Sequence, residues 1–159
     1  MNHLFIVRHG DYGENDRIND FGRNQMRVLG VAIKQILNGS SIYLFSSSAP
    51  RALGSSRILA AQMVLSPEFE QVPYLWSGSD SPRDSYYYNP SLDKLMELVS
   101  ERRNRADGLV MVTHLEVTDS FPSNFVEQEF NQVNGIGGIS KGKAVHIDLE
   151  NRTYQILPK

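Results

Sequence analysis

The sequence predicts one α/β domain with a mixed, mainly parallel sheet, and two observations support this prediction. Apolar, strand-like runs alternate with helix-like segments along the 159 residues, a pattern typical of parallel sheets joined by crossover helices. The last two strand-like runs are separated only by a short turn at Glu150-Asn151, which favours an antiparallel hairpin. The chain shows no linker, repeat or low-complexity tract. Residues 1–159 are therefore interpreted as a single domain, long enough to bury a substantial core.

The first half of the chain is expected to hold three strands and two helices. Apolar residues from Met26 to Leu37 recur on one face of a helix, which either Asn19 or Asp20 caps and Asn38-Gly39 ends. Pro50 is well tolerated in the first turn of the second helix. The strands are predicted over residues 4–7, 42–45 and 70–72, and the helices over residues 20–37 and 50–63.

The second half begins with a polar, proline-containing loop over residues 77–90. A helix is predicted next, because its apolar residues again fall on one face. A buried strand then ends at Thr113-His114, and short strands close the chain. The predicted helices cover residues 91–103 and 121–130, and the predicted strands cover residues 109–112, 136–139, 144–149 and 153–157.

Composition narrows the range of functions before any motif is considered. The chain has no cysteine, which excludes disulfides, thiolate metal sites and cysteine nucleophiles. Its formal net charge of −2 lacks the basic excess typical of nucleic-acid binders, so no nucleic-acid partner is expected. No apolar stretch is long enough for a signal-peptide core or a membrane span. We expect a cytoplasmic protein without a membrane partner, in which any affinity for phosphate comes from local arginines.

Polar side chains capable of chemistry follow three of the predicted strands. Arg8-His9-Gly10 ends the first, three serines lead from the second to Arg51, and His114 ends a later one. Each alone has an ordinary structural explanation: Arg51 as a solvated residue in the first turn of a helix, and either histidine as a locally hydrogen-bonded side chain. If the strands are parallel neighbours, however, their ends meet at one edge of the sheet, where open α/β sheets bind ligands. The pattern therefore predicts one crevice with two histidines and two arginines.

This combination of side chains suits phosphoryl transfer, which needs positioning and neutralisation of spread negative charge. Arg8 and Arg51 can grip phosphate oxygens, and His9 can attack phosphorus through a neutral ring nitrogen while its other nitrogen donates to an acceptor such as a backbone carbonyl. Gly10 allows a sharp turn and a close backbone approach to the anion. His114 can donate a hydrogen bond or carry positive charge. Two arginines disfavour a bound cation, so no metal and no cofactor are expected.

Four motifs in this order resemble the histidine phosphatase superfamily, which has the phosphoglycerate-mutase-like fold. They are Arg8-His9-Gly10, Ile18-Asn19-Asp20-Phe21-Gly22, Ser47-Ser48-Ala49-Pro50-Arg51-Ala52 and Val112-Thr113-His114. The resemblance implies a three-layer sandwich, with a mainly parallel mixed sheet flanked by helices. It further implies that His9 is the phosphorylated nucleophile and that Arg8, Arg51 and His114 complete the phosphate pocket. Asn15 matches a phosphate-contacting asparagine of some members.

Within the superfamily, the short chain is most similar to the small bacterial phosphohistidine phosphatases. It departs from them at Glu116, where that group tends to have proline, and at Ser55, where threonine is common. Many superfamily members use a glutamate as proton donor; here the loop offers Asp80, which we prefer by position, or Asp84. Both aspartates are equally well explained as solvated turn residues. Arg83 could contact the body of the substrate or belong to a loop packed on itself.

Two classes of function remain open on sequence grounds. The first is a phosphatase acting on a phosphorylated protein, in particular one that bears phosphohistidine, or on a small phosphate ester. The second is a phosphate-binding module without turnover that recognises a phosphorylated partner. A mutase is disfavoured because the chain between Arg51 and His114 is too short to supply a lid. Either class predicts that replacing Arg8 or Arg51 weakens phosphate or vanadate binding more than replacing a surface arginine such as Arg102.

Overall fold

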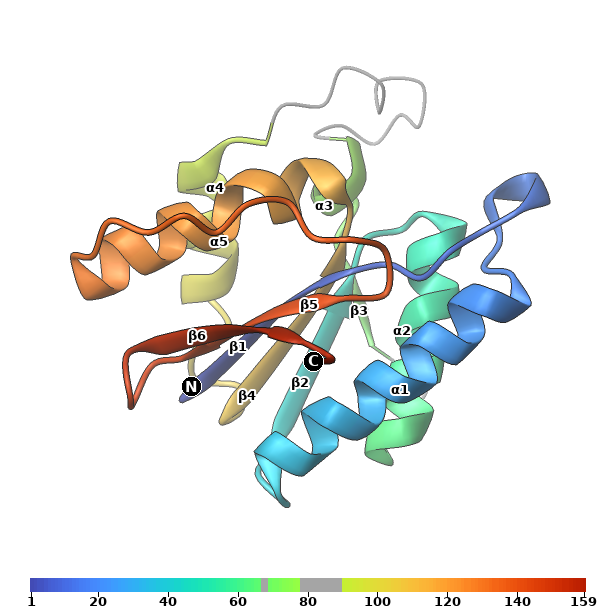
Figure 1. The fold of residues 1–159 in the computed structure, drawn as a ribbon, viewed down its shortest axis with the longest axis horizontal. Helices are drawn as coiled ribbons and strands as arrows, with labels where there is room; N and C mark the ends of the chain where they lie inside the picture. Colours follow the sequence, from blue (N-terminus) through green and yellow to red (C-terminus); the bar gives the residue numbers. More distant parts are fainter. Residues whose placement is uncertain (67–68, 78–89) are drawn as a thin grey trace.

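A single mixed sheet organises the protein (Figure 1). The computed structural model describes residues 1–66, 69–77 and 90–159. The strand order is β3-β2-β4-β1-β5-β6, in which β4 pairs in parallel with both β1 and β2, β3 pairs in parallel with β2, and β5 pairs antiparallel with both β1 and β6. The strands are β1 (His3–Arg8), β2 (Ile42–Ser46), β3 (Glu70–Gln71), β4 (Gly108–Thr113), β5 (Ala144–Asp148) and β6 (Thr153–Leu157).

Helices cover both faces of this sheet, so the predicted three-layer α/β sandwich is confirmed (Figure 1). One face carries α4 and α5, and the opposite face carries α1 and α2. The helices are α1 (Asp20–Leu37), α2 (Pro50–Met63), α3 (Tyr74–Ser77), α4 (Leu92–Ser100) and α5 (Leu115–Phe130), with a short 3-10 turn η1 (Glu14–Asp16) before α1. Within the described residues, no helix is both long and apolar enough to cross a bilayer.

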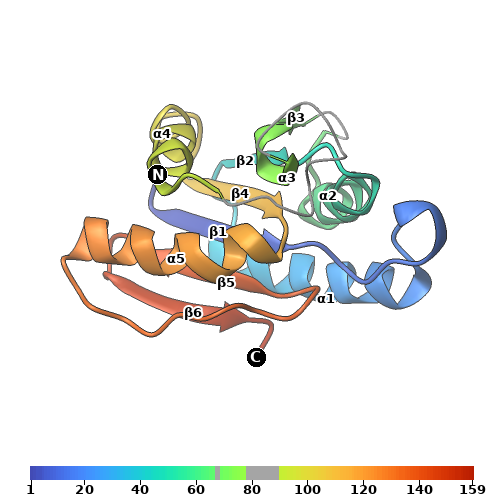
Figure 2. The same cartoon turned by 90° about the horizontal axis from the view of Figure 1, so that it is seen from above.

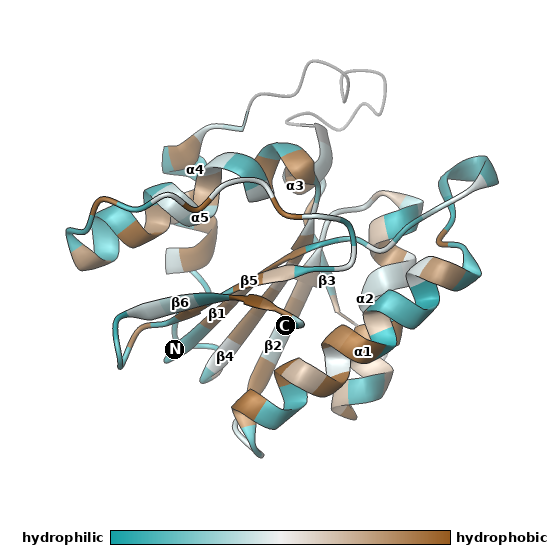
Figure 3. Cartoon of the chain, viewed as in Figure 1, coloured by the Kyte–Doolittle hydropathy of each residue, from teal (hydrophilic) through white to brown (hydrophobic). Residues whose placement is uncertain are grey.

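The alternation of side chains along the central strands explains why the sheet is buried on both faces. Leu4 and Ile6 belong to the apolar cluster under α4 and α5, whereas Phe5 and Val7 belong to the cluster under α1 and α2. A strand that must fill two cores reads as a continuous apolar run, as the sequence of β1 does. In Figure 3 the central strands are accordingly brown, whereas the exposed faces of the helices are teal.

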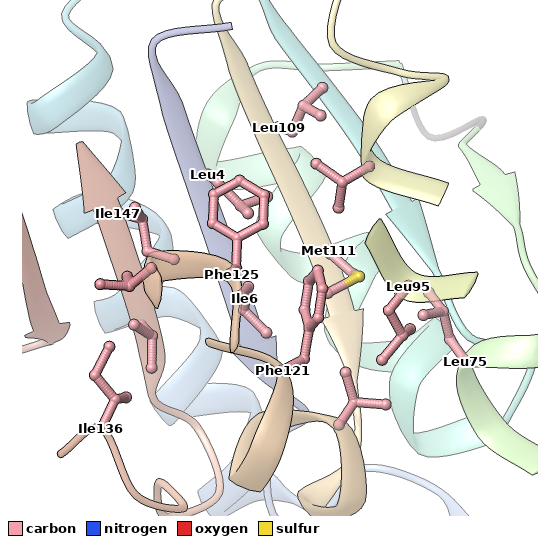
Figure 4. Close-up of a cluster of buried hydrophobic side chains, with 14 of the residues drawn as sticks. Leu4, Ile6, Leu75, Leu95, Leu109, Met111, Phe121, Phe125, Ile136 and Ile147 are labelled. Carbon is pink, nitrogen blue, oxygen red and sulfur yellow. The ribbon is translucent and has the colours of Figure 1, made fainter. Parts of the chain in front are cut away.

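Phe121 and Phe125 fill the space between α5 and the sheet (Figure 4). Both rings are fully buried, and their centroids lie 5.8 Å apart in an edge-to-face arrangement, a favourable geometry for an aromatic pair. They pack in the same cluster as Ile6 and Met111 of the two central strands. This contact fixes α5 against the sheet and therefore also fixes His114, the residue directly before the first residue of α5.

The structure corrects the predicted strand at residues 136–139, which has no regular secondary structure. Ile136 and Ile139 are both buried, but they are three residues apart, whereas the side chains on one face of a strand are two apart. Gly137 and Gly138 between them offer no side chain to a sheet, and glycine disfavours strand interiors. The two isoleucines therefore anchor a loop across the core.

Helix α5 begins six residues earlier than predicted, at Leu115 instead of Phe121. Pro122 favours a helix start near its own position, yet here it lies in the second turn of the helix. Val117, buried one turn before Phe121, extends the apolar face toward the N-terminus. The remaining predicted elements are present with small shifts at their ends, and Asn19, not Asp20, caps α1 by accepting the backbone N–H of Gly22 at 2.8 Å.

Candidate functional site

The ends of β1, β4 and β2 bring the predicted functional residues together. Figure 2 shows β1 and β4 running side by side toward the same end of the molecule. Arg8 is in register with Thr113, and the backbone N–H of His9 donates to the Thr113 carbonyl at 3.1 Å. The rings of His9 and His114 consequently have centroids only 5.0 Å apart. Arg51 reaches the same place from the first turn of α2.

The two ring nitrogens of His9 have partners that fix its tautomer. Its Nδ1 lies 2.8 Å from the Gly10 carbonyl oxygen, which can only accept a hydrogen bond, so Nδ1 carries the proton. The Nε–H of Arg51 donates to His9 Nε2 at 3.1 Å, and a guanidinium can only donate. His9 is therefore neutral, with a lone pair on Nε2. This is the form a nucleophilic imidazole needs.

Burial and neighbouring cations keep His9 in this neutral form. The side chain is 4% exposed, and burial lowers the pKa of His9 to about 3, opposed by the bond to Gly10 and assisted by the charges of Arg51, Arg8 and Lys141. Burial disfavours a charged imidazole, and so does a nearby positive charge. The lone pair on Nε2 is therefore available throughout the neutral pH range.

The low pKa of His9 predicts that the folded protein loses stability in acid. Between a pKa of about 3 in the folded state and the ordinary value of 6.5, the unfolded chain binds one more proton than the folded chain. The free energy of unfolding should therefore fall by about 1.4 kcal/mol per pH unit as the pH is lowered through this window. Urea unfolding from neutral to acidic pH measures this slope. A His9→Gln variant should show a shallower slope, and identical slopes would contradict the assignment.

Arg51 is held by three groups from the loop that follows β1. Its Nη1 donates to Asp16 Oδ1, its Nε donates to His9, and its guanidinium carbon lies 4.9 Å from the centre of the Tyr12 ring. The side chain is only 16% exposed. An arginine fixed by a carboxylate and an aromatic face keeps its fork in one orientation, which suits it to contact a bound anion.

Arg8 is oriented by the loop that replaces the predicted strand. Its Nη1 donates to the Ile139 carbonyl at 2.8 Å. Burial lowers the pKa of Arg8 below its usual value, while the charges of Glu116 and Tyr12 oppose this shift. The guanidinium stays charged at neutral pH, because arginine titrates far above it.

His114 is the N-terminal flanking residue of α5 and is bonded to Ser47. Its Nε2 lies 2.6 Å from Ser47 Oγ, which also accepts the backbone N–H of Ala49. The serine hydroxyl can donate to Nε2 of a neutral imidazole, an arrangement that places the imidazole proton on Nδ1. Burial, together with the nearby charges of Arg51 and Arg8, lowers the pKa of His114 well below its ordinary value. His114 is thus a neutral donor.

Three buried N–H groups near this cluster have no hydrogen-bond partner among the described residues: Arg8 Nε, His114 Nδ1 and Trp76 Nε1. The Trp76 ring lies 6.5 Å from the His114 ring, with 26° between their planes. Leaving a buried donor unpaired costs about 1–3 kcal/mol. The charge and orientation of the Arg8 and His114 donors suit a tetrahedral oxyanion, and such a ligand would relieve the cost of leaving them unpaired.

Gly10 turns the chain where there is no room for a side chain. A Cβ at Gly10 would lie 2.7 Å from the Gly22 carbonyl oxygen. The Gly10 N–H donates to Ser55 Oγ at 3.0 Å, and Ser55 in turn donates to the Arg51 carbonyl. Ser55, which departs from the common threonine, therefore links the loop after β1 to α2.

The other predicted site residues lie elsewhere. Asn15 is exposed, with a left-handed φ of 56°, and lines a cavity that neither His9 nor His114 lines. Asp80, Asp84 and Arg83 fall outside the described residues, so their predicted roles stay predictions. Within the described part of the chain, no three histidine, aspartate or glutamate side chains gather as metal ligands would.

Sequence reasoning missed Asp16, Ser47 and Trp76 as parts of the site. Ser47 belongs to the run of serines before α2, and from the sequence this run predicts only a polar turn. Asp16 lies in a loop whose sequence spacing does not reveal the bond to Arg51. For Trp76 the only signal is a large aromatic residue shortly after the predicted strand at 70–72, and aromatic residues are far more often part of a core.

No protein-family model matches the sequence, and no curated protein matches it. Its fold, in contrast, is similar to many solved structures. The protein histidine phosphatase SixA complexed with tungstate has a TM-score of 0.66 and 14% identity, with 97% of this chain and 93% of that chain covered. The mycobacterial glucosyl-3-phosphoglycerate phosphatase complexed with VO3 has a TM-score of 0.63 and 13% identity, covering 100% and 99%.

A phosphoserine phosphatase mutant from Entamoeba histolytica, in complex with phosphoserine, has a TM-score of 0.56 and 14% identity, covering 99% of this chain and 96% of that chain. At such identities the comparison concerns the fold. The fold class predicted from the sequence motifs is confirmed: the chain adopts the phosphoglycerate-mutase-like α/β fold of these solved structures.

Proposed function

We propose that this protein is a metal-independent phosphatase that works through a phosphohistidine intermediate on His9. The observation that carries the proposal is the tautomer of His9: Nδ1 donates to the Gly10 carbonyl, so Nε2 keeps a lone pair, to which Arg51 donates. Arg8, Arg51 and the neutral donor His114 surround this nitrogen. Such a set of donors neutralises the charge on the oxygens of a transferring phosphoryl group.

The proposed reaction has two displacements at phosphorus. His9 Nε2 forms a bond to phosphorus as the bond to the leaving group breaks, and the leaving group takes up a proton. Water then attacks the phosphohistidine, the N–P bond breaks, and orthophosphate and neutral His9 result. Arg51 would shift from the lone pair of Nε2 to a phosphoryl oxygen, a small movement because its Nε is already 3.1 Å from that nitrogen.

A phosphohistidine-bearing protein is the substrate class we propose. Among the structures that this fold resembles, SixA is described as a protein histidine phosphatase. A protonated imidazole is a good leaving group, so such a substrate needs little acid catalysis. Two described carboxylates lie near the site: Asp16 is paired with Arg51, and the charge of Glu116 acts on Arg8. Neither is hydrogen-bonded to His9, and this arrangement fits a leaving group that needs little help.

Wild type is expected to release p-nitrophenol from p-nitrophenyl phosphate and to carry acid-labile phosphate after rapid quenching. The His9→Ala variant should do neither, because it lacks the ring nitrogen that Arg51 contacts and that is proposed to attack phosphorus. Quenched-flow trapping and steady-state release measure the two effects. Equal and negligible release from both proteins, with vanadate still bound, would favour a phosphate-binding module instead.

Asp80 is the candidate general acid. Its replacement is expected to lower kcat more for a substrate with a poor leaving group than for one with a good leaving group. Asp80→Asn should lower kcat for an alkyl phosphate by about 100-fold, because general acid catalysis typically contributes about 10²–10⁴. It should change hydrolysis of a phosphoramidate by less than about threefold, since that leaving group is already protonated. Asp84→Asn is the matched control. Similar losses in Asp80→Asn and Asp84→Asn would remove Asp80 from the assignment.

A further inference from the structure

A separate cavity adjoins the proposed phosphate pocket. It has a volume of about 620 Å³ and lies between η1, the start of α1 and the first two turns of α2. None of His9, Arg8 or His114 lines it. The lining residues are Asn15, Arg17, Ile18, Arg23, Pro50, Leu53, Gly54 and Arg57.

Three arginines on this wall give the cavity a strongly positive character. Within the described part of the chain, the Arg17 and Arg57 side chains form no hydrogen bond or ion pair. Among the described residues, the Arg23 side chain pairs only with the exposed Asp20, at 3.9 Å, a contact that contributes little. The carboxylate of Asp16, which lies between Asn15 and Arg17 in the chain, is already paired with Arg51. This concentration of positive charge stands out on a chain whose formal net charge is −2.

The cavity is coupled to the phosphate pocket through two shared walls. Asn15 and Arg17 flank Asp16, which holds Arg51. Ile18 lies between the two sites, since its side chain would be 3.0 Å from a Cβ at Gly10 and 2.7 Å from one at Gly54. Pro50, the residue before Arg51, also lines the cavity, so the cavity neighbours the proposed phosphate pocket on the side of Arg51. Ile18, Pro50 and Leu53 provide apolar surface for the carbon frame of a ligand.

We propose that this cavity binds a second anionic group of the substrate, a carboxylate or a phosphate attached to the same molecule as the transferred phosphoryl group. Arginine forks match the planar carboxylate and the phosphate oxygens, and such charge-assisted bonds are about twice as strong as neutral ones. The inference rests on the proposed phosphatase function. In a protein substrate the group is an acidic side chain near the phosphorylated residue; in a small substrate it is a second phosphate or carboxylate.

The test compares ligands with and without a second anion. One series is orthophosphate and linear polyphosphates of increasing length. The other is a pair of phosphopeptides that differ only in having aspartate or alanine beside the phosphorylated residue. Their binding to wild type and to a triple variant, Arg17→Gln, Arg23→Gln and Arg57→Gln, is measured by titration calorimetry, with orthophosphate as the internal reference. We expect the triple variant to lose about tenfold or more in preference for the doubly anionic ligand.

A matched variant with the same loss of charge, Arg27→Gln, Lys34→Gln and Arg105→Gln, controls for the overall field. These residues are exposed and do not line the cavity, and the preference should stay within about twofold of wild type. A preference lost only for the aspartate peptide assigns the second anion to a protein, and one lost only for polyphosphate assigns it to a small molecule. An unchanged preference for both, or equal losses in the two triple variants, would overturn the proposal.

Binding measured by calorimetry tests the second anion site independently of phosphatase activity. If p-nitrophenyl phosphate is not hydrolysed, the phosphatase function fails, yet a preference that depends on the three arginines still establishes the second anion site. If hydrolysis depends on His9 but the preference does not depend on the arginines, the phosphatase stands and the second site fails.

Discussion

Replacing Arg51 by alanine is expected to lower kcat for p-nitrophenyl phosphate by about 10³-fold, which is within the range seen when one charged donor to a transferring phosphoryl group is removed. Arg51 is fixed by Asp16 and Tyr12 and touches the attacking nitrogen of His9. Its removal leaves both the lone pair and the phosphoryl oxygens without their donor. Steady-state kinetics and vanadate titration measure the loss, and vanadate affinity should fall with kcat.

Arg51→Lys distinguishes charge from geometry. A lysine keeps the positive charge but lacks the planar fork that reaches His9 and Asp16 together, so we expect a partial recovery of vanadate affinity and little recovery of kcat. Arg27→Ala, an exposed position on α1, is the control. Comparable affinities in Arg51→Ala and Arg27→Ala would contradict the phosphate pocket.

Arg102, which sequence reasoning took as a surface arginine, cannot serve as this control. It is 9% exposed, and its guanidinium donates to both oxygens of Glu70 and to the Leu98 carbonyl. Replacing it would leave a half-buried carboxylate without its partner and would test folding more than binding.

Replacing Phe125 by alanine is expected to lower the free energy of unfolding by about 3–5 kcal/mol, the usual cost of removing a buried aromatic ring. Phe125 is fully buried, packs edge-to-face with Phe121, and holds α5 against the sheet. Because α5 starts directly after His114, the site should loosen together with the core. Urea denaturation gives the energy, and residual phosphatase activity at low temperature reports the site.

Val28→Ala is the matched comparison for Phe125→Ala. Val28 lies on α1 and is 48% exposed, and alanine favours a helix slightly more than valine. Its effect should stay within about 0.5 kcal/mol. A Phe125→Ala protein as stable as Val28→Ala would mean that the α5 contact contributes little to the fold.

The sheet and the four central site residues could be predicted from sequence because their signals are local. A continuous apolar run such as Leu4 to Val7 identifies a strand buried on both faces. A polar residue directly after this run lies at the carboxyl end of the strand. Parallel pairing of β1, β4 and β2 then places His9 and His114 side by side. The orientation of each side chain did not follow from these signals.

Long-range contacts decided what the sequence left open. The false strand at 136–139 had two isoleucines and no local sign that the Ile139 carbonyl would accept from Arg8, which is far away in the sequence. The tautomer of His9 depends on Gly10 and Arg51 together, and that of His114 depends on Ser47. Each of these bonds joins a group whose direction is set by the packing of a different element.

The sequence by itself thus determined the α/β class, the positions of most strands and helices, and which four side chains meet at the sheet edge. Only the tertiary structure decided which nitrogen of His9 carries the proton and which partners hold Arg8 and Arg51. It also decided that three further arginines line an adjoining cavity. The physical reason is that apolar periodicity is a property of neighbouring residues in the sequence. Hydrogen-bond direction and cavity shape, in contrast, are set only when distant elements pack together.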